Sequence, residues 1–132
     1  MHGNLGEPFR VEPIGDGFSL RFYDRSNRYY GDYHRIRVVV RMEIPVRREF
    51  FLDERDPDRA CDRARRWLGD VVCFEKSLER MGVPGSQVAS VRDELVASFL
   101  ATAAGYMNKP DFPGKFVRKS VQERQKGPRP VA

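Results

Sequence analysis

The sequence predicts an α+β fold, in which an antiparallel meander of three to four strands is covered by a long antiparallel helical hairpin. Two observations predict it. In the first half of the 132 residues, apolar and polar side chains alternate, which is the period of a half-buried strand. In the second half, apolar residues recur three and four positions apart, which is the period of an amphipathic helix.

Three strands are expected in the first half, at about residues 8–14, 18–24 and 33–45. The third is the longest, because the alternation continues from Ile36 to Ile44. Between the first two, Asp16 and Gly17 can supply the positive φ angles of a tight hairpin turn. Residues 46–52 follow a proline, and they either extend the long strand past a kink or turn back as a fourth strand.

Two helices are expected in the second half, at about residues 57–81 and 87–107. Asp56 and Pro57 form a helix start signal, with a capping carboxylate followed by a proline at the first helical position. From Ala60 to Met81 the apolar positions advance by alternating steps of four and three, which is the spacing of a seam against another helix. Gly82 begins a short connection, so we expect the two helices to be antiparallel neighbours.

We expect one α+β domain over residues 1–107 and a C-terminal segment over residues 108–132 that contains several prolines and glycines. The segment has few apolar side chains, which predicts disorder over residues 120–132 and docking of residues 108–119 through two phenylalanines. The expected helices are long for so small a sheet. Their ends are therefore buried either by the C-terminal segment or in a homodimer, which we favour.

Positive charge is concentrated in residues 108–132. The chain carries a net charge of +5 and has an isoelectric point near 9.5. The segment accounts for the whole excess, so the remainder is electrically balanced. Cationic segments are typical of proteins that bind nucleic-acid phosphates or acidic protein surfaces. The candidate nucleic-acid-binding residues are Lys109, Lys115, Arg118, Lys119, Arg124, Lys126 and Arg129.

A second candidate site is the polar and aromatic segment from Tyr23 to His34, which is expected to be a loop. Arginine forks and exposed aromatic rings can hold a phosphate, stack on a base or anchor a protein interface. Ordinary turn chemistry explains the same composition. The candidate ligand-binding or anion-binding residues in it are Arg25, Arg28, Tyr29, Tyr30, Asp32 and His34.

A third candidate is the outer face of the sheet. If residue 15 pairs with residue 18, and Tyr23 pairs with Tyr33, then Glu12, Arg21 and Arg35 form one row. Arg37 would lie close to this row. An anion-binding face and a plain solvated face are both consistent with this pattern.

The first expected helix carries an excess of arginine in its early turns, where the helix dipole disfavours cations. Contact with a phosphate, contact with a carboxylate of another subunit and simple solvation each explain this excess. The residues are Arg59, Arg63, Arg65 and Arg66.

Composition and motifs narrow the function classes. Charged residues make up 33% and the mean hydropathy is −0.61, which argues against a membrane-spanning protein. The start, MHGNLGEPF, lacks the pattern of a secretory signal, so we expect a cytoplasmic protein. Cys61 and Cys73, placed on one expected helix, are too far apart for a disulfide. No motif predicts catalysis, a metal ion or a cofactor.

The sequence leaves three hypotheses open. We favour a small non-enzymatic interaction module that self-associates and binds an acidic partner, either a nucleic acid or an acidic protein surface, through its basic segment and arginine-rich edges. The alternatives are a small-ligand or enzymatic site built by residues 23–34, and a purely structural oligomer subunit. Whether the protein is an enzyme stays open.

Overall fold

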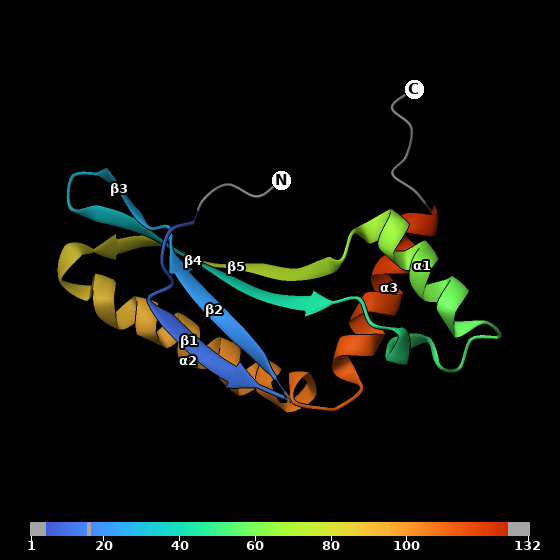
Figure 1. Cartoon of the computed structure of the whole chain (residues 1–132). Helices are drawn as coiled ribbons and strands as arrows, with labels where there is room; N and C mark the ends of the chain where they lie inside the picture. The colour runs from blue at the N-terminus through green and yellow to red at the C-terminus, as the bar shows by residue number, and fades with distance from the viewer. Residues whose placement is uncertain (1–4, 16, 127–132) are drawn as a thin grey trace, which may run out of the picture. The chain divides into compact units, whose positions relative to one another are not determined.

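The structure, a computed structural model, describes residues 5–15 and 17–126. Its elements are, in chain order, β1 (Arg10–Ile14), β2 (Phe18–Asp24), β3 (Asn27–Tyr30), β4 (Tyr33–Pro45), the 3-10 helix η1 (Arg48–Phe51), α1 (Pro57–Leu68), β5 (Val71–Pro84), the 3-10 helix η2 (Gly85–Gln87), α2 (Val88–Met107) and α3 (Phe112–Lys126) (Figure 1). The strands of this described part form an antiparallel sheet, so the predicted α+β class is confirmed.

The chain folds into two compact units. The first consists of Met1–Met42 and Phe74–Asn108, and the second of Glu43–Cys73 and Lys109–Ala132. One of the points where the chain passes between units lies close to the predicted domain boundary at residue 107. The other two lie inside β4 and β5.

The core of the first unit lies between the sheet and α2. Alternate residues of β4, among them Ile36, Val38 and Val40, are completely buried. Helix α2 runs along this face of the sheet (Figure 1), and the ring of its Phe99 meets Phe22 of β2 edge-on, with the ring centroids 6.2 Å apart. The predicted strands at 18–24 and 33–45 and the predicted helix at 87–107 are confirmed.

The predicted strand register is wrong at both hairpins. Ile14 pairs with Phe18, so Glu12 lies opposite Leu20 instead of Arg21. Between β2 and β4 the chain forms an additional strand, β3, where we expected a loop. Because β3 occupies the start of β4, β2 pairs further along, and Arg21 lies opposite Arg41 instead of Arg35.

The predicted helix over residues 57–81 is wrong beyond Leu68, and no helical hairpin with α2 forms. Gly69 ends α1: its φ of 84° lies in the left-handed region, and its N–H donates to the carbonyl of Arg65 at 2.8 Å. After it the chain becomes strand β5, which pairs with β4. Residues 46–52 form no fourth strand, because η1 occupies most of this stretch. Cys61 and Cys73 therefore lie on different elements, and neither forms a disulfide.

The predicted disorder of residues 120–126 is also wrong, because these residues lie in α3. This helix docks through Pro113 and Val117, both of which are buried, while Phe112 and Phe116 are half-buried and stack on each other. Residues 127–132, Arg129 among them, lie outside the described residues. Helix α1 has only 12 residues. It is much shorter than the predicted helix over residues 57–81, whose length was the reason to expect burial of its ends in a homodimer. Self-association therefore stays a prediction.

Substituting Val117 tests whether α3 belongs to the folded second unit. Its side chain is 0% exposed, so Val117→Ala leaves a cavity, and we expect the free energy of unfolding to fall by about 2 kcal/mol. Urea denaturation measures the change. The exposed Lys119→Ala is the matched control and should change stability by less than about 0.5 kcal/mol. An unchanged midpoint for Val117→Ala would contradict docking of this helix.

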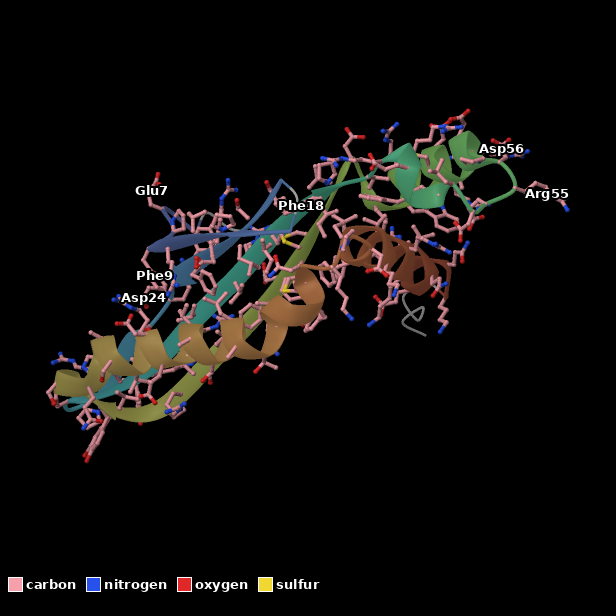
Figure 2. All side chains as sticks on the ribbon, turned by 90° about the horizontal axis from the view of Figure 1, so that it is seen from below. Glu7, Phe9, Phe18, Asp24, Arg55 and Asp56 are labelled. Atoms are coloured by element: carbon pink, nitrogen blue, oxygen red, sulfur yellow. The ribbon has the colours of Figure 1, made fainter. Side chains whose placement is uncertain are left out.

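Asp24 links β2 to α2. Its Oδ1 accepts the Ser26 N–H at 2.9 Å, and its Oδ2 accepts from Nη1 of Arg92 at 3.3 Å. The Arg92 guanidinium also lies 4.7 Å from the ring centroid of Phe9, and Figure 2 labels Phe9 and Asp24 on the same side of the unit. Burial alone would raise the pKa of Asp24, but the hydrogen bonds from Ser26 and Arg92 outweigh it and hold the pKa below its ordinary value.

This link predicts a pH-dependent contribution to stability. A carboxyl whose pKa is lowered on folding stabilises the protein above its unfolded pKa, and loses that contribution as the pH falls through the folded pKa. We expect Asp24→Asn to cost about 1 kcal/mol at neutral pH. The cost should shrink steadily below about pH 4. Urea titrations across this range measure it. The exposed Glu94→Gln, on the same helix as Arg92, is the control, and an equal cost for Asp24→Asn at all pH values would disprove the link.

Candidate functional site

The arginines on the outer face of the sheet already have partners. Nη2 of Arg35 lies 2.7 Å from Oε2 of Glu79, and Arg37 donates to the hydroxyl of Ser77 at 3.2 Å. The hydrogen bond from Arg35 lowers the pKa of Glu79, and the same contact raises the pKa of Arg35. Strand β5 thus supplies the anions that the arginines of β4 need. The candidate residues Arg35 and Arg37 are brought together here, but as part of an ion-paired sheet face.

Arg41 on β4 is also paired with a carboxylate of β5. Its Nε lies 3.2 Å from Oε1 of Glu75 on β5. The carboxylate lies on one side of Arg41, while Arg21 of β2 is its cross-strand neighbour on the other side. Like charges opposite each other are unfavourable, and the nearby carboxylate offsets that cost.

The segment from Tyr23 to His34 contains the end of β2, the connection to β3, and the turn of the β3–β4 hairpin. Tyr29 and Tyr30 are 48% and 75% exposed, and Arg25 and Arg28 are also exposed. The segment carries these side chains at its surface.

Of the candidate residues in this segment, Asp32 and His34 lie next to each other. Nε2 of His34 lies 3.8 Å from Oδ1 of Asp32. The other carboxylate oxygen and the backbone carbonyl of Asp32 both accept the Gly85 N–H, at 3.2 and 3.1 Å. Asp32 therefore ties the hairpin to the start of η2, which is a structural role.

Helix α3 orders most of the basic C-terminal segment. With 3.6 residues per turn, positions spaced by four, three and four fall on one face. In α3 these positions are occupied by Lys115, Lys119, Gln122 and Lys126, all of them exposed. The buried Val117 lies on the opposite face. We call this set of four residues the basic face.

The cations of α3 differ in their partners. Lys115 pairs with Asp111 at 2.9 Å, and Arg118 pairs with Asp53 at 2.9 Å. The hydrogen bond from Lys115 lowers the pKa of Asp111 despite partial desolvation. Within the described chain, Lys119, Arg124 and Lys126 have no ion-pair partner. Lys109 lies just before the helix and is exposed.

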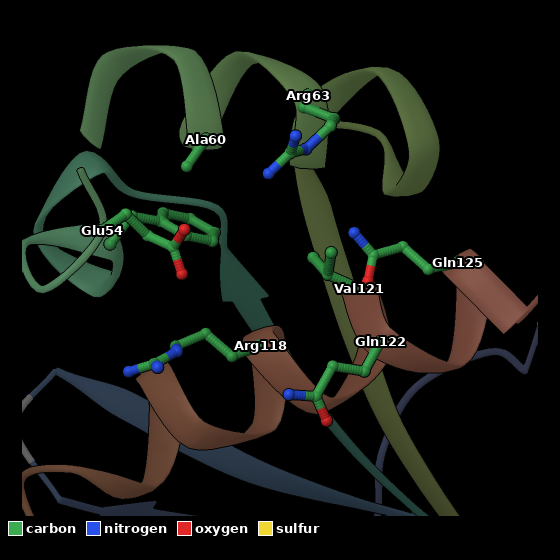
Figure 3. Close-up of a pocket in the computed structure, with 8 residues that line it drawn as sticks. Glu54, Ala60, Arg63, Arg118, Val121, Gln122 and Gln125 are labelled. Atoms are coloured by element: carbon green, nitrogen blue, oxygen red, sulfur yellow. The ribbon is translucent and has the colours of Figure 1, made fainter. Parts of the chain in front are cut away.

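Beside the basic face, η1, α1 and α3 line a half-open cavity of about 260 Å³ within the second unit (Figure 3). Polar side chains make up most of its lining, with three apolar residues between them. The lining residues are Phe51, Glu54, Ala60, Arg63, Arg118, Val121, Gln122 and Gln125. Figure 3 shows Arg63 reaching into the cavity from α1, and Arg118 approaching from α3.

Sequence reasoning identified only part of this cavity. Arg118 was a candidate as a basic residue, and Arg63 belonged to the unexplained excess of arginine on the first helix. Glu54, Gln122 and Gln125 carried no signal, because polar residues of these types are common on any solvated surface. Over the described residues, no group of three or more His, Cys, Asp or Glu side chains is placed to hold a metal ion.

The chain matches no known protein-family model, no curated protein and no solved structure. Among the helices of the described part, none is both long and apolar enough to cross a membrane.

The pairing of the sheet arginines can be tested by removing their anions. In the double variant Glu75→Gln and Glu79→Gln, Arg41 and Arg35 lose their carboxylates, so we expect heparin to retain the protein to a higher salt concentration. Salt-gradient elution measures this. Glu7→Gln with Glu94→Gln removes the same charge from exposed positions of the first unit. An equal effect in that control pair would show that net charge alone is responsible.

Proposed function

We propose that this protein binds the phosphate backbone of a nucleic acid through the basic face of α3. The observation that carries the proposal is the row of exposed lysines on one face of an ordered helix, two of which, Lys119 and Lys126, have no ion-pair partner in the described chain. The phosphate backbone is a dense, regular array of anions, with about one negative charge per 1.7 Å of duplex axis.

The spacing of the row suits a polyanion. Successive lysines at 115, 119 and 126 are about 6 and 10.5 Å apart along the axis, at ~1.5 Å per residue. A polymer lying along the helix can therefore contact all three. The exposed pair between Lys115 and Asp111 is worth little, because solvent screens it, so a phosphate can replace the carboxylate.

Binding through the lysines of the basic face depends on the phosphate charges and not on the base sequence. The basic face contains no aromatic side chain on which a base could stack. We therefore expect weak, sequence-independent and strongly salt-dependent association. An acidic protein surface presents fewer and more dispersed charges, so it should compete poorly with a nucleic acid.

The experiment is a salt series of binding to a fluorescent single-stranded oligonucleotide. In Lys119→Gln with Lys126→Gln, two contacts are lost, and we expect the magnitude of the slope of log K against log salt to decrease by about 1.4. Substitutions are preferable to deletion of the segment, because deletion would also remove the buried Val117 and disrupt the second unit.

Arg25→Gln with Arg28→Gln is the matched control. It removes the same charge from the Tyr23–His34 segment, the alternative candidate site, and should leave the slope unchanged. A larger loss in this control than in the lysine pair would transfer the site to that segment. A preference for an acidic peptide over the oligonucleotide at equal salt would overturn the choice of partner.

A further inference from the structure

The cavity beside α3 contains an arginine whose hydrogen-bonding capacity is incompletely used. Nε of Arg63 is buried and has no hydrogen-bond partner in the described chain. The guanidinium carbon lies 5.9 Å from the ring centroid of Trp67, which constrains the side chain without satisfying this donor. A buried N–H without an acceptor is unfavourable, and the guanidinium also carries four terminal N–H donors, so Arg63 keeps hydrogen-bonding capacity for a ligand.

A second arginine contributes to the same cavity. Arg118 lies across from Arg63 in Figure 3, and its ion pair with Asp53 involves one of its terminal nitrogens, at 2.9 Å. A guanidinium carries five N–H donors, so Arg118 retains donors for a ligand. Two guanidinium groups around one cavity favour an anion with several acceptor oxygens, and the forked geometry of arginine fits a phosphate.

The remaining polar residues argue against a bare inorganic anion. Glu54 lines the cavity, and its carboxylate repels an anion but accepts hydrogen bonds from hydroxyl groups. Gln122 and Gln125 offer both donors and acceptors. An anionic group next to several hydroxyls would therefore use the lining more completely than phosphate alone.

The size of the cavity limits the ligand. At about 260 Å³, it is smaller than the ~300 Å³ at which pockets for drug-sized ligands begin. Few apolar side chains line it, so an aromatic base gains little there. A compact, polar molecule fits best.

We propose that this cavity binds a small phosphomonoester with neighbouring hydroxyls, of the sugar-phosphate class. Arg63 is the principal phosphate ligand, Arg118 supplies the second positive charge, and Glu54 and the glutamines accept and donate to the hydroxyls. This inference goes beyond the proposed function, since it rests on the cavity and not on the lysines of the basic face. The phosphomonoester has two sources: a free sugar phosphate, or the 5′-phosphorylated end of a nucleic acid.

The test is calorimetric titration of the full chain with ribose 5-phosphate, inorganic phosphate and ribose. We expect ribose 5-phosphate to bind at least about 10-fold more tightly than either of the other two, since it alone satisfies both sets of donors and acceptors. Equal affinity for inorganic phosphate and ribose 5-phosphate would overturn the sugar-phosphate class. No detectable binding of any phosphate would overturn the site.

Variants of α1 localise the binding. Arg63→Gln should weaken ribose 5-phosphate binding by about 10- to 100-fold, as expected for loss of a charged hydrogen-bonding group. Arg63→Lys, which retains charge without the fork, should bind with an affinity between those of Arg63→Gln and the unaltered protein. The matched control is Arg66→Gln, an exposed arginine on the same helix that does not line the cavity. An equal loss in Arg66→Gln would reduce the effect to general electrostatics and overturn the assignment.

Glu54→Gln provides an independent readout in case an arginine variant does not fold. Removing the carboxylate should increase affinity for inorganic phosphate and decrease the preference for ribose 5-phosphate. An unchanged preference would contradict the role of Glu54.

Two oligonucleotides distinguish the sources. If a 5′-phosphorylated strand binds more tightly than its 5′-hydroxyl counterpart, and this gain in affinity disappears in Arg63→Gln, the natural ligand is a nucleic-acid end. If the two strands bind equally well while ribose 5-phosphate still binds, the natural ligand is a free sugar phosphate. Lys119→Gln with Lys126→Gln should leave ribose 5-phosphate binding intact. Failure of the basic-face proposal would thus be recognisable separately from failure of this one.

Discussion

The alternation of side chains along β4 is the constraint on which the first unit depends. Residues such as Ile36, Val38 and Val40 have no exposed surface, and each contributes about 1.5–3 kcal/mol when it is buried. These apolar side chains must be shielded from water, and α2 provides the apolar surface that packs against them. The intervening positions carry Arg35 and Arg37, which need anions or hydroxyls beside them. Strand β5 provides these with Glu79 and Ser77, so one strand determines what both its covering helix and its neighbouring strand must contain.

The strands with strict alternation could be predicted from the sequence, and β5 could not, for two reasons. Lys76 occupies a position facing α2, with its ammonium 5.9 Å from the ring centroid of Phe99. A charged residue there hides the period of two. The apolar residues that begin at Ala60 also happen to keep a helical spacing of four and three positions into β5, which made this strand look like a continuation of the helix. Gly69 was the decisive signal, because its φ of 84° is unfavourable for other residues and ends α1 long before Gly82.

Helix α3 was missed because proline and glycine at its start are usually read as loop residues. Pro113 is acceptable in the first turn, where its missing N–H has no helical partner to lose. Gly114 permits close approach of Phe50, since a Cβ at this position would lie 3.2 Å from the ring atom Cδ1. The cavity was beyond sequence reasoning for a different reason: its lining comes from Glu54, α1 and α3, which only tertiary packing brings together. The excess of arginine on α1 and the basic residue Arg118 were the partial signals.

Arginine and lysine are used differently in this protein, and this links the two proposals. Arg35, Arg92 and Arg118 each contact a carboxylate of a distant segment, which suits the rigid fork of arginine. Lysine is a compact and strongly hydrated charge on a flexible chain, so lysines on the basic face keep their water and can exchange it for polymer phosphates. Arg63 follows neither pattern, because it is a fork directed into a cavity with a buried donor still unused. A rigid donor of this kind favours one well-placed acceptor over a diffuse polyanion, which is why a discrete phosphomonoester is the better partner for the cavity and a nucleic-acid backbone the better partner for α3.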